Sequence, residues 1–129
     1  MKNSIYILLI VGLITLTSAT SSEKNKKPKP KFQRVVAFKF KESSEVARKK
    51  HMKDFETFVK EVKQVLSYRA GKTVKGEGST DPEYDVMHYI TFENEADIIT
   101  YDIHPAHKKF IAENRDNWEK VVVVNGAIE

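Results

Sequence analysis

The sequence feature that most constrains the fold is the segment at residues 84–92, in which every second residue from Tyr84 to Phe92 falls on one face and Asp85, Met87, Tyr89 and Thr91 fall on the other. A period of two is typical of a half-buried β-strand. The inward side of this strand is predicted to carry Tyr84, Val86, His88, Ile90 and Phe92. Further strands are indicated at residues 34–41, around residues 68–74, and at residues 121–124, which are four consecutive valines.

A long amphipathic helix is indicated between the first two strands. Ser43 or Ser44 is its predicted N-cap, because serine oxygens accept hydrogen bonds from the free backbone N–H groups of a first helical turn. Apolar residues then recur at steps of three and four, as they do along the buried side of a helix. This stripe is predicted to comprise Met52, Phe55, Val59, Val62 and Leu66.

A second helical segment follows the strand at residues 84–92. Asn94 is its predicted N-cap, and the helix should run over residues 95 to about 103, break at Pro105 and resume toward Trp118. The predicted order of elements is therefore β-α-β-β-α-β. This order is the split βαβ arrangement of an α+β, ferredoxin-like fold, with helices on one face of an antiparallel sheet.

The other face of this sheet has no covering layer in the sequence. We expect this face to carry six apolar residues, or else the residues next to them in the sequence. The six are Val35, Ala37, Met87, Tyr89, Val121 and Val123. An apolar sheet face must be buried against another element. We therefore expect a homodimer in which two sheets pack face to face.

The beginning of the chain differs in character from the rest. Lys2, an apolar run at residues 5–16 and the small residues before position 20 have the three parts of a secretory signal peptide at residues 1–19, with cleavage after Ala19. An uncleaved anchor is the alternative, although twelve apolar residues are fewer than the ~20 that cross a bilayer. Cleavage would leave a secreted or periplasmic protein without stable membrane insertion.

Positive charge is concentrated in the segment that follows, residues 20–32, which contains five lysines and one glutamate. We expect a disordered basic linker there, or alternatively a basic arm for an anionic surface. The net charge of the whole chain is +4, whereas residues 33–129 carry 16 basic and 17 acidic side chains. The predicted folded domain is therefore nearly neutral, and we expect no nucleic-acid partner. The chain has no cysteine, which excludes disulfides and thiol chemistry.

One short motif carries most of the chemistry in this domain. In Tyr101-x-x-His104-Pro105-Ala106-His107, proline favours the first turn of a new helix, so His107 lies at a helix N-terminus whose dipole opposes protonation. A neutral imidazole beside the Tyr101 phenol could act as a base and a carbonyl polariser. The alternative is that both residues only pack and cap a helical corner.

The other histidines give weaker signals. A metal site of His88, His104 and His107 lacks an acidic partner, so no metal is expected. His51 follows two lysines and is expected at the surface or at the edge of a pocket.

The domain resembles the stress-responsive dimeric α+β barrel (Dabb) family over roughly residues 33–127. The resemblance rests on the opening strand at residues 35–41, the strand at 84–92, the segment from Tyr101 through His107 to Phe110, and Trp118-Glu119-Lys120. It implies a ferredoxin-like protomer, a homodimeric barrel and a pocket between helices and sheet. In one plant branch, cofactor-free polyketide cyclases use the tyrosine and second histidine of this motif as the catalytic pair.

The sequence departs from that branch at two positions. Arg34 and Val86 stand where the cyclases have further pocket histidines, and His88 could supply an imidazole from the same strand face. The cyclase substrate class is therefore not carried over. A haem-degrading or quinol-oxidising monooxygenase has only the broad fold in its favour.

Two functional hypotheses follow, and neither requires a cofactor. The first is an exported dimeric module that binds a small apolar or aromatic molecule without turnover. The second is an aldol-type lyase or cyclase in which His107 is the general base and Tyr101 stabilises the oxyanion. Besides this pair, the residues expected to line the ligand site are Arg34, Val36, Phe38, Phe55, His88, Ile90, His104, Phe110 and Trp118.

Overall fold

The computed structural model describes residues 31–78 and 83–129, so the predicted signal peptide and residues 20–30 lie outside the described residues. The elements are β1 (Lys31–Phe40), α1 (Glu45–Glu61), β2 (Val65–Lys72), β3 (Val86–Phe92), α2 (Glu95–Ile103), α3 (Pro105–Asn114), the 3-10 turn η1 (Arg115–Asn117) and β4 (Trp118–Ile128). The linker was expected to reach residue 32, but Lys31 and Phe32 already belong to β1.

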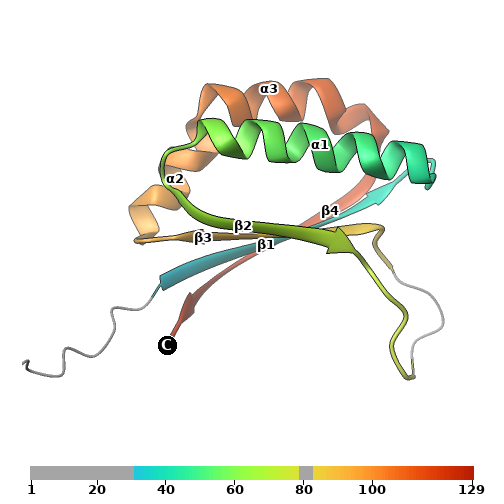
Figure 1. Ribbon diagram of the computed structural model, residues 1–129, viewed down its shortest axis with the longest axis horizontal. Helices are drawn as coiled ribbons and strands as arrows, with labels where there is room; N and C mark the ends of the chain where they lie inside the picture. Colours follow the sequence, from blue (N-terminus) through green and yellow to red (C-terminus); the bar gives the residue numbers. More distant parts are fainter. Residues whose placement is uncertain (1–30, 79–82) are drawn as a thin grey trace, which may run out of the picture.

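The four strands form one antiparallel sheet in the order β2-β3-β1-β4. The helices lie on one face of this sheet, and the opposite face is open (Figure 1). The predicted ferredoxin-like α+β architecture is therefore confirmed, with the second helical segment divided into α2 and α3 at the proline.

Helix α1 begins where the sequence predicted and ends earlier. Ser44 is the N-cap, and its hydroxyl accepts a hydrogen bond from the Ala47 N–H at 3.1 Å. The helix ends at Glu61, so the predicted stripe extends too far: Leu66 lies in β2 and is half exposed. Pairing of β2 with β3 starts at Val65, and an extended strand there is incompatible with another helical turn.

The second helical segment also ends before the predicted position. Asn94 caps α2 by accepting a hydrogen bond from the Asp97 N–H at 3.0 Å, and Pro105 is the first residue of α3, as expected. Helix α3 stops at Asn114, however, and Trp118 is the first residue of β4. Trp118 lies opposite Phe40 in the pairing of β4 with β1, which places it in the sheet.

The core lies between the helices and the sheet. Strand β3 shows the predicted alternation most clearly, because Val86, His88, Ile90 and Phe92 are all completely buried. Phe55, Phe58 and Val59 of α1 pack over them, together with residues of β1. Burial of so many large apolar side chains supplies the main free energy that favours this fold.

The register of β4 decides which of its valines lie on the open face, where either Val121 and Val123 or their neighbours were expected. Val123 lies opposite Val36, and paired residues of adjacent strands point to the same side of a sheet. Val121 and Val123 therefore face the helix side, whereas Val122 and Val124 lie on the open face. All four are between 37% and 56% exposed, and for Val122 and Val124 the reason is that the helices lie on the other face of the sheet.

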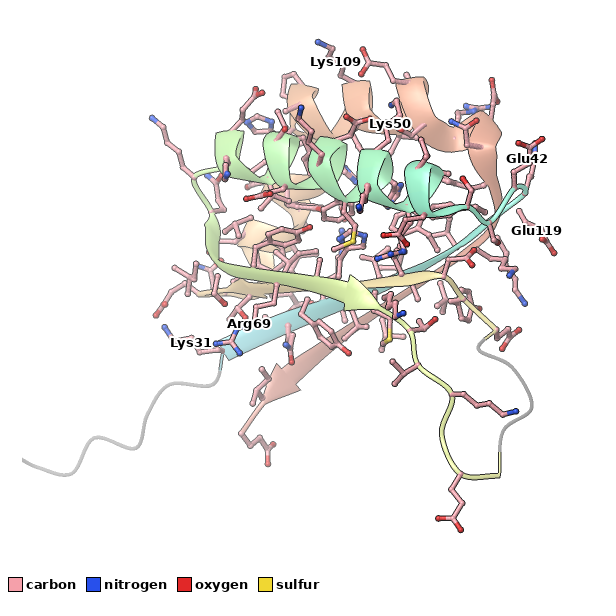
Figure 2. The ribbon with its side chains drawn as sticks, turned by 45° about the vertical axis from the view of Figure 1, so that its right-hand side comes forward. Lys31, Glu42, Lys50, Arg69, Lys109 and Glu119 are labelled. Atoms are coloured by element: carbon pink, nitrogen blue, oxygen red, sulfur yellow. The ribbon has the colours of Figure 1, made fainter. Side chains whose placement is uncertain are left out.

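Charged side chains project from the outer sides of the helices. Lys50 on α1 and Lys109 on α3 both point away from the sheet (Figure 2). Among the described residues, no helix has the length and apolar character needed to cross a membrane.

Candidate functional site

A cavity of about 200 Å³ lies between the sheet and the helices, at the corner where α2 meets α3. Its walls contain eight residues that the sequence singled out, namely Arg34, Val36, Phe38, Phe55, Tyr101, His107, Phe110 and Trp118. Four lining residues were not predicted: Asp102, Ile111, Val121 and Val123.

Tyr101, in the last turn of α2, is only 1% exposed and lines the cavity. Its ring centroid lies 4.6 Å from that of His107. Burial raises the pKa of the phenol, although the positive charge of Arg34 opposes this change. The Tyr101 hydroxyl therefore keeps its proton at neutral pH and can donate a hydrogen bond to a group in the cavity.

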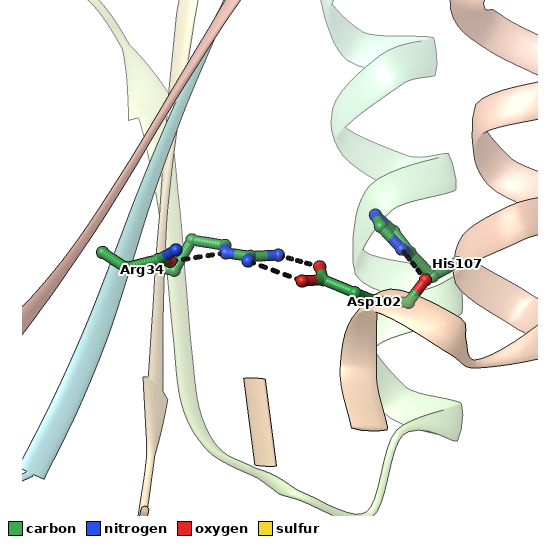
Figure 3. Close-up of polar contacts among 4 residues, drawn as sticks. Arg34, Asp102 and His107 are labelled. Atoms are coloured by element: carbon green, nitrogen blue, oxygen red, sulfur yellow. Dashed lines mark hydrogen bonds and ion pairs between the residues drawn. The ribbon is translucent and has the colours of Figure 1, made fainter. Parts of the chain in front are cut away.

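His107 lies in the first turn of α3, as predicted. Its hydrogen-bond partner shows which of its two ring nitrogens carries the proton. The Nδ1 atom lies 3.1 Å from the backbone oxygen of Asp102 (Figure 3). A carbonyl oxygen can only accept, so Nδ1 carries the proton and Nε2 carries the lone pair of the neutral ring. Burial lowers the pKa of His107, and the hydrogen bond to Asp102 works in the opposite direction. The expected neutral imidazole is present, with burial as its main cause.

Arg34 reaches from β1 across the cavity to α2. Its guanidinium donates two hydrogen bonds to the carboxylate of Asp102, one of them 3.0 Å long, and its Nε donates to Asn125 Oδ1 at 2.8 Å (Figure 3). The guanidinium carbon also lies 5.2 Å from the centre of the Tyr101 ring. Arg34 is 6% exposed, so its charge is buried but compensated, and the cavity carries no net charge from this pair.

His104 does not line this cavity, contrary to the prediction. Its Nδ1 accepts a hydrogen bond from the backbone N–H of Ala106 at 3.1 Å, which makes His104 the N-cap of α3. Because Pro105 has no N–H, a side-chain cap at this point satisfies one of the remaining free donors of the first turn.

His88 and Ile90 are also not in the cavity walls; both are completely buried in the core. His88 Nδ1 lies 2.9 Å from the Tyr68 hydroxyl, and its Nε2 lies 3.2 Å from Nε2 of His51. The His88 ring stacks on Phe55 at a centroid distance of 3.8 Å. His88 therefore belongs to a buried polar chain beneath α1.

His51 was expected near the surface and is instead 4% exposed. It lies one helical turn before Phe55, so both side chains point to the sheet while Lys49 and Lys50 remain exposed. Burial lowers the pKa of His51 to about 4 and that of His88 to about 2. Both rings are consequently neutral at pH 7.

Between largely apolar walls, the cavity has a donor and an acceptor at the corner of α2 and α3. The donor is the Tyr101 hydroxyl and the acceptor is Nε2 of His107. Such a pair can bind a neutral ligand, or transfer a proton if the ligand is reactive. Within residues 31–78 and 83–129, no cluster of three or more His, Cys, Asp and Glu side chains could hold a metal ion.

The sequence profile of the stress responsive A/B barrel domain (Dabb) matches residues 32–126. The chain belongs to the Dabb family. The match includes two parts of the chain that line the cavity, namely Arg34 on β1 and the segment from Tyr101 to His107. No curated protein sequence matches the chain significantly.

Solved structures with the same fold come from bacteria and plants. A Dabb protein from Mesorhizobium loti superposes with a TM-score of 0.66 and 17% identity, covering 76% of this chain and 96% of that one. A dimeric ferredoxin-like protein from Thermobifida fusca superposes with a TM-score of 0.64 and 15% identity, covering 77% of this chain and 92% of that one. A hydroxynitrile lyase from Passiflora edulis superposes with a TM-score of 0.67 and 19% identity, covering 79% of this chain and 96% of that one. At these identities the likeness establishes the shared Dabb fold.

Proposed function

We propose that this Dabb protein is an exported homodimer that binds a small, uncharged, apolar or aromatic molecule in the cavity between helices and sheet. The observation that carries the proposal is the cavity itself. Phe38, Phe55 and Phe110 contribute aromatic surface to its walls, while Tyr101 and His107 supply two convergent polar points. Apolar walls with a few placed polar groups are typical of small-molecule sites.

The size and charge of the cavity limit the ligand. Its volume of about 200 Å³ is below the ~300–1,000 Å³ of ordinary ligand pockets, which favours a compact molecule over a long acyl chain. Among the residues that the structure describes, the ionic groups in its walls are Arg34 and Asp102, which pair with each other. A neutral ligand is therefore favoured over an anion, because an anion would have to compete with the Asp102 carboxylate.

Export and dimerisation rest on separate observations. The signal-peptide pattern at residues 1–19 supports export. The open sheet face supports a dimer, since Tyr89, Val122 and Val124 are exposed on it and no element of the described chain covers them. The Thermobifida fusca structure of the same fold is described as dimeric.

Native mass spectrometry of the protein purified without denaturation tests the proposal. We expect the dimer ion to be heavier than two polypeptide chains by the mass of a small bound ligand, and to lose this ligand on collisional activation. The released compound should be neutral and apolar or aromatic. A homogeneous apo-protein that also takes up nothing from a panel of small neutral aromatic compounds would contradict the binding function.

A second candidate is a cofactor-free lyase, favoured by the contact between Tyr101 and His107. His107 Nε2 could remove a proton α to a carbonyl while the Tyr101 hydroxyl donates to the oxygen on which negative charge develops. The hydroxynitrile lyase from Passiflora edulis has the same fold. Export weighs against a cyclase that acts on acyl-thioesters, because such substrates are cytoplasmic.

The His107→Asn variant separates binding from catalysis. An asparagine amide can keep the donor that Nδ1 provides to Asp102 while removing Nε2. A lyase should lose turnover of a β-keto thioester or a hydroxynitrile by ~100-fold or more, with affinity nearly unchanged. Tyr101→Phe should lower turnover as well. If the unaltered protein converts none of these compounds, the lyase candidate is contradicted for these substrate classes.

A further inference from the structure

Two buried histidines and the partly buried Tyr68 form a continuous hydrogen-bonded chain beneath α1. The Tyr68 hydroxyl contacts Nδ1 of His88 at 2.9 Å, and Nε2 of His88 contacts Nε2 of His51 at 3.2 Å. The remaining nitrogen, Nδ1 of His51, has no hydrogen-bond partner among the described residues. This nitrogen is accessible rather than sealed in the core, because among the described residues the fully buried side-chain nitrogen or oxygen atom without a partner is Nε1 of Trp118. Nδ1 of His51 can therefore form a hydrogen bond with a molecule from outside.

The chain can be protonated in two directions without any change of charge. If the Tyr68 hydroxyl donates to His88, then His88 donates to His51, and Nδ1 of His51 carries a proton. If His51 donates to His88, then His88 donates to the Tyr68 oxygen, and Nδ1 of His51 carries a lone pair. His51 can therefore offer either a donor or an acceptor at Nδ1 while both rings stay neutral.

His51 forms part of the wall of a second cavity, of about 400 Å³, which is larger than the Tyr101–His107 cavity. It lies where the start of α1 meets the end of α3 and η1. The buried side chain of Asn114 uses its Nδ2 to donate to the Phe110 carbonyl, which leaves its oxygen available as an acceptor. Phe40 and Trp118 give the cavity flat apolar surface.

The rim of this second cavity is electrically balanced. Lys41 and Lys50 face it together with Glu42 and Asp116, all four of which are exposed. Figure 2 shows Glu42 at this end of the molecule and Lys50 on α1. Two positive and two negative side chains give no preference for a charged ligand, and the polar groups deeper inside, His51 and Asn114, are neutral.

We propose that this second cavity is a separate binding site for a small planar molecule that carries a hydroxyl or carbonyl group, with Nδ1 of His51 as its hydrogen-bond partner. Trp118 lines both cavities and separates the two sites. The second cavity lies elsewhere in the fold than Tyr101 and His107 and has different polar groups, so the proposal does not depend on the proposed function.

Phenol is a suitable probe, with toluene as the matched compound that lacks the hydroxyl. The chain contains a single tryptophan, so fluorescence and the indole NMR signal of Trp118 report on both cavities. Imidazole ¹⁵N shifts then tell the sites apart, because they distinguish His51 from His107. We expect phenol to bind saturably at millimolar concentration and to shift Nδ1 of His51, and toluene to bind at least about tenfold more weakly.

Two substitutions of His51 separate the two ring nitrogens. Glutamine can place its amide near the position of Nε2 and keep the contact with His88, but it offers nothing at Nδ1; asparagine does the reverse. His51→Gln should weaken phenol binding about tenfold, whereas His51→Asn should retain it. His107→Asn should leave phenol binding at this site unchanged.

The ¹⁵N measurement on the unaltered protein needs no variant, so it decides even if a His51 substitution fails to fold. The proposal is overturned if phenol shifts His107 and leaves His51 unchanged, or if it does not bind saturably. It is also overturned if His51→Gln and His51→Asn lose binding to the same extent, because His51 then supports the fold only.

Discussion

The Nε2 atoms of His51 and His88 lie 3.2 Å apart within the core, so one imidazole must donate a proton to the other. Two protonated rings could not share this contact, because both nitrogens would then be donors. Burial lowers the pKa of His51 to about 4 and that of His88 to about 2, from an ordinary value of 6.5. The contact thus excludes a charge on both rings at once, and burial keeps both histidines neutral in the native structure at neutral pH.

The lowered pKa values predict that the protein loses stability as the pH falls below about 6.5. The unfolded chain takes up a proton on each histidine near that pH, whereas the folded chain does not until the pH approaches 4 for His51 and 2 for His88. The unfolded state thus binds more protons, and the free energy of unfolding should decrease by up to about 1.4 kcal/mol per pH unit for each histidine. Urea titrations between pH 7.5 and 5 measure this slope.

The His51→Gln variant is the control for this slope. It removes one of the two titrating rings while an amide can still reach His88. Its stability should therefore fall less steeply over the same pH range. Equal slopes for the two proteins, or a flat profile for the unaltered one, would show that the pair is not what makes folding sensitive to acid.

The pairing of Arg34 with Asp102 predicts unequal costs for removing its two members. Asp102→Asn leaves a guanidinium with 7% side-chain exposure without its counter-charge, and we expect a loss of about 2 kcal/mol, moderated because Asp102 is 44% exposed. Arg34→Met removes the buried charge itself and leaves a carboxylate that water can still solvate. Chemical denaturation of both variants measures the difference.

The double variant Arg34→Met/Asp102→Asn completes the cycle. It contains neither the buried charge nor its partner, so it should be more stable than Asp102→Asn alone. If instead the two single losses simply add, the ion pair contributes no more than an ordinary surface pair.

Local periodicity made most of the fold predictable from the sequence. The alternation at residues 84–92 and the two helix caps depend on near neighbours in the chain. The structure confirms the alternation from Val86 to Phe92, although Tyr84 lies before the strand, and it confirms Asn94 as a cap and selects Ser44 over Ser43. The side of the sheet on which Val121 and Val123 lie depends on how β4 pairs with β1, about ninety residues away. A run of four valines has no alternation from which this register could be read.

The site shows the same division between local and distant relationships. Proline at position 105 was enough to bring Tyr101 and His107 together, because both lie at one helical corner. The contact of Arg34 with Asp102 joins positions that are 68 residues apart in the sequence, so no local pattern predicts it. For His51 a signal did exist, since it lies four residues before Phe55 on the inward side of α1.

Filling the smaller cavity should abolish binding there without unfolding the protein. Val123 lines this cavity from β4 and is about half exposed, so a larger side chain has room to enter the cavity without compressing the core. We expect Val123→Phe to change stability by no more than about 0.5 kcal/mol and to lose the retained ligand in native mass spectra. Val46→Phe, on an exposed position of α1, should keep it. Full ligand occupancy in Val123→Phe would place the ligand elsewhere.

The open sheet face leads to a prediction about assembly. Val124 is 56% exposed on that face, at the centre of β4, and a face-to-face dimer would bury it. Val124→Lys should therefore produce a monomer, because burying an unpaired ammonium in an apolar interface costs several kcal/mol. Size-exclusion chromatography with light scattering at micromolar concentration measures the mass of each species.

Val46→Lys is the matched control for this experiment. Val46 is 78% exposed as well, but it lies on α1, on the opposite side of the sheet. A dimer that survives Val46→Lys and dissociates with Val124→Lys uses the open face, since both variants add the same charge to an exposed valine. If the unaltered protein is already a monomer at micromolar concentration, the open face is not a dimer interface. If Val124→Lys remains a dimer, the subunits associate through another surface.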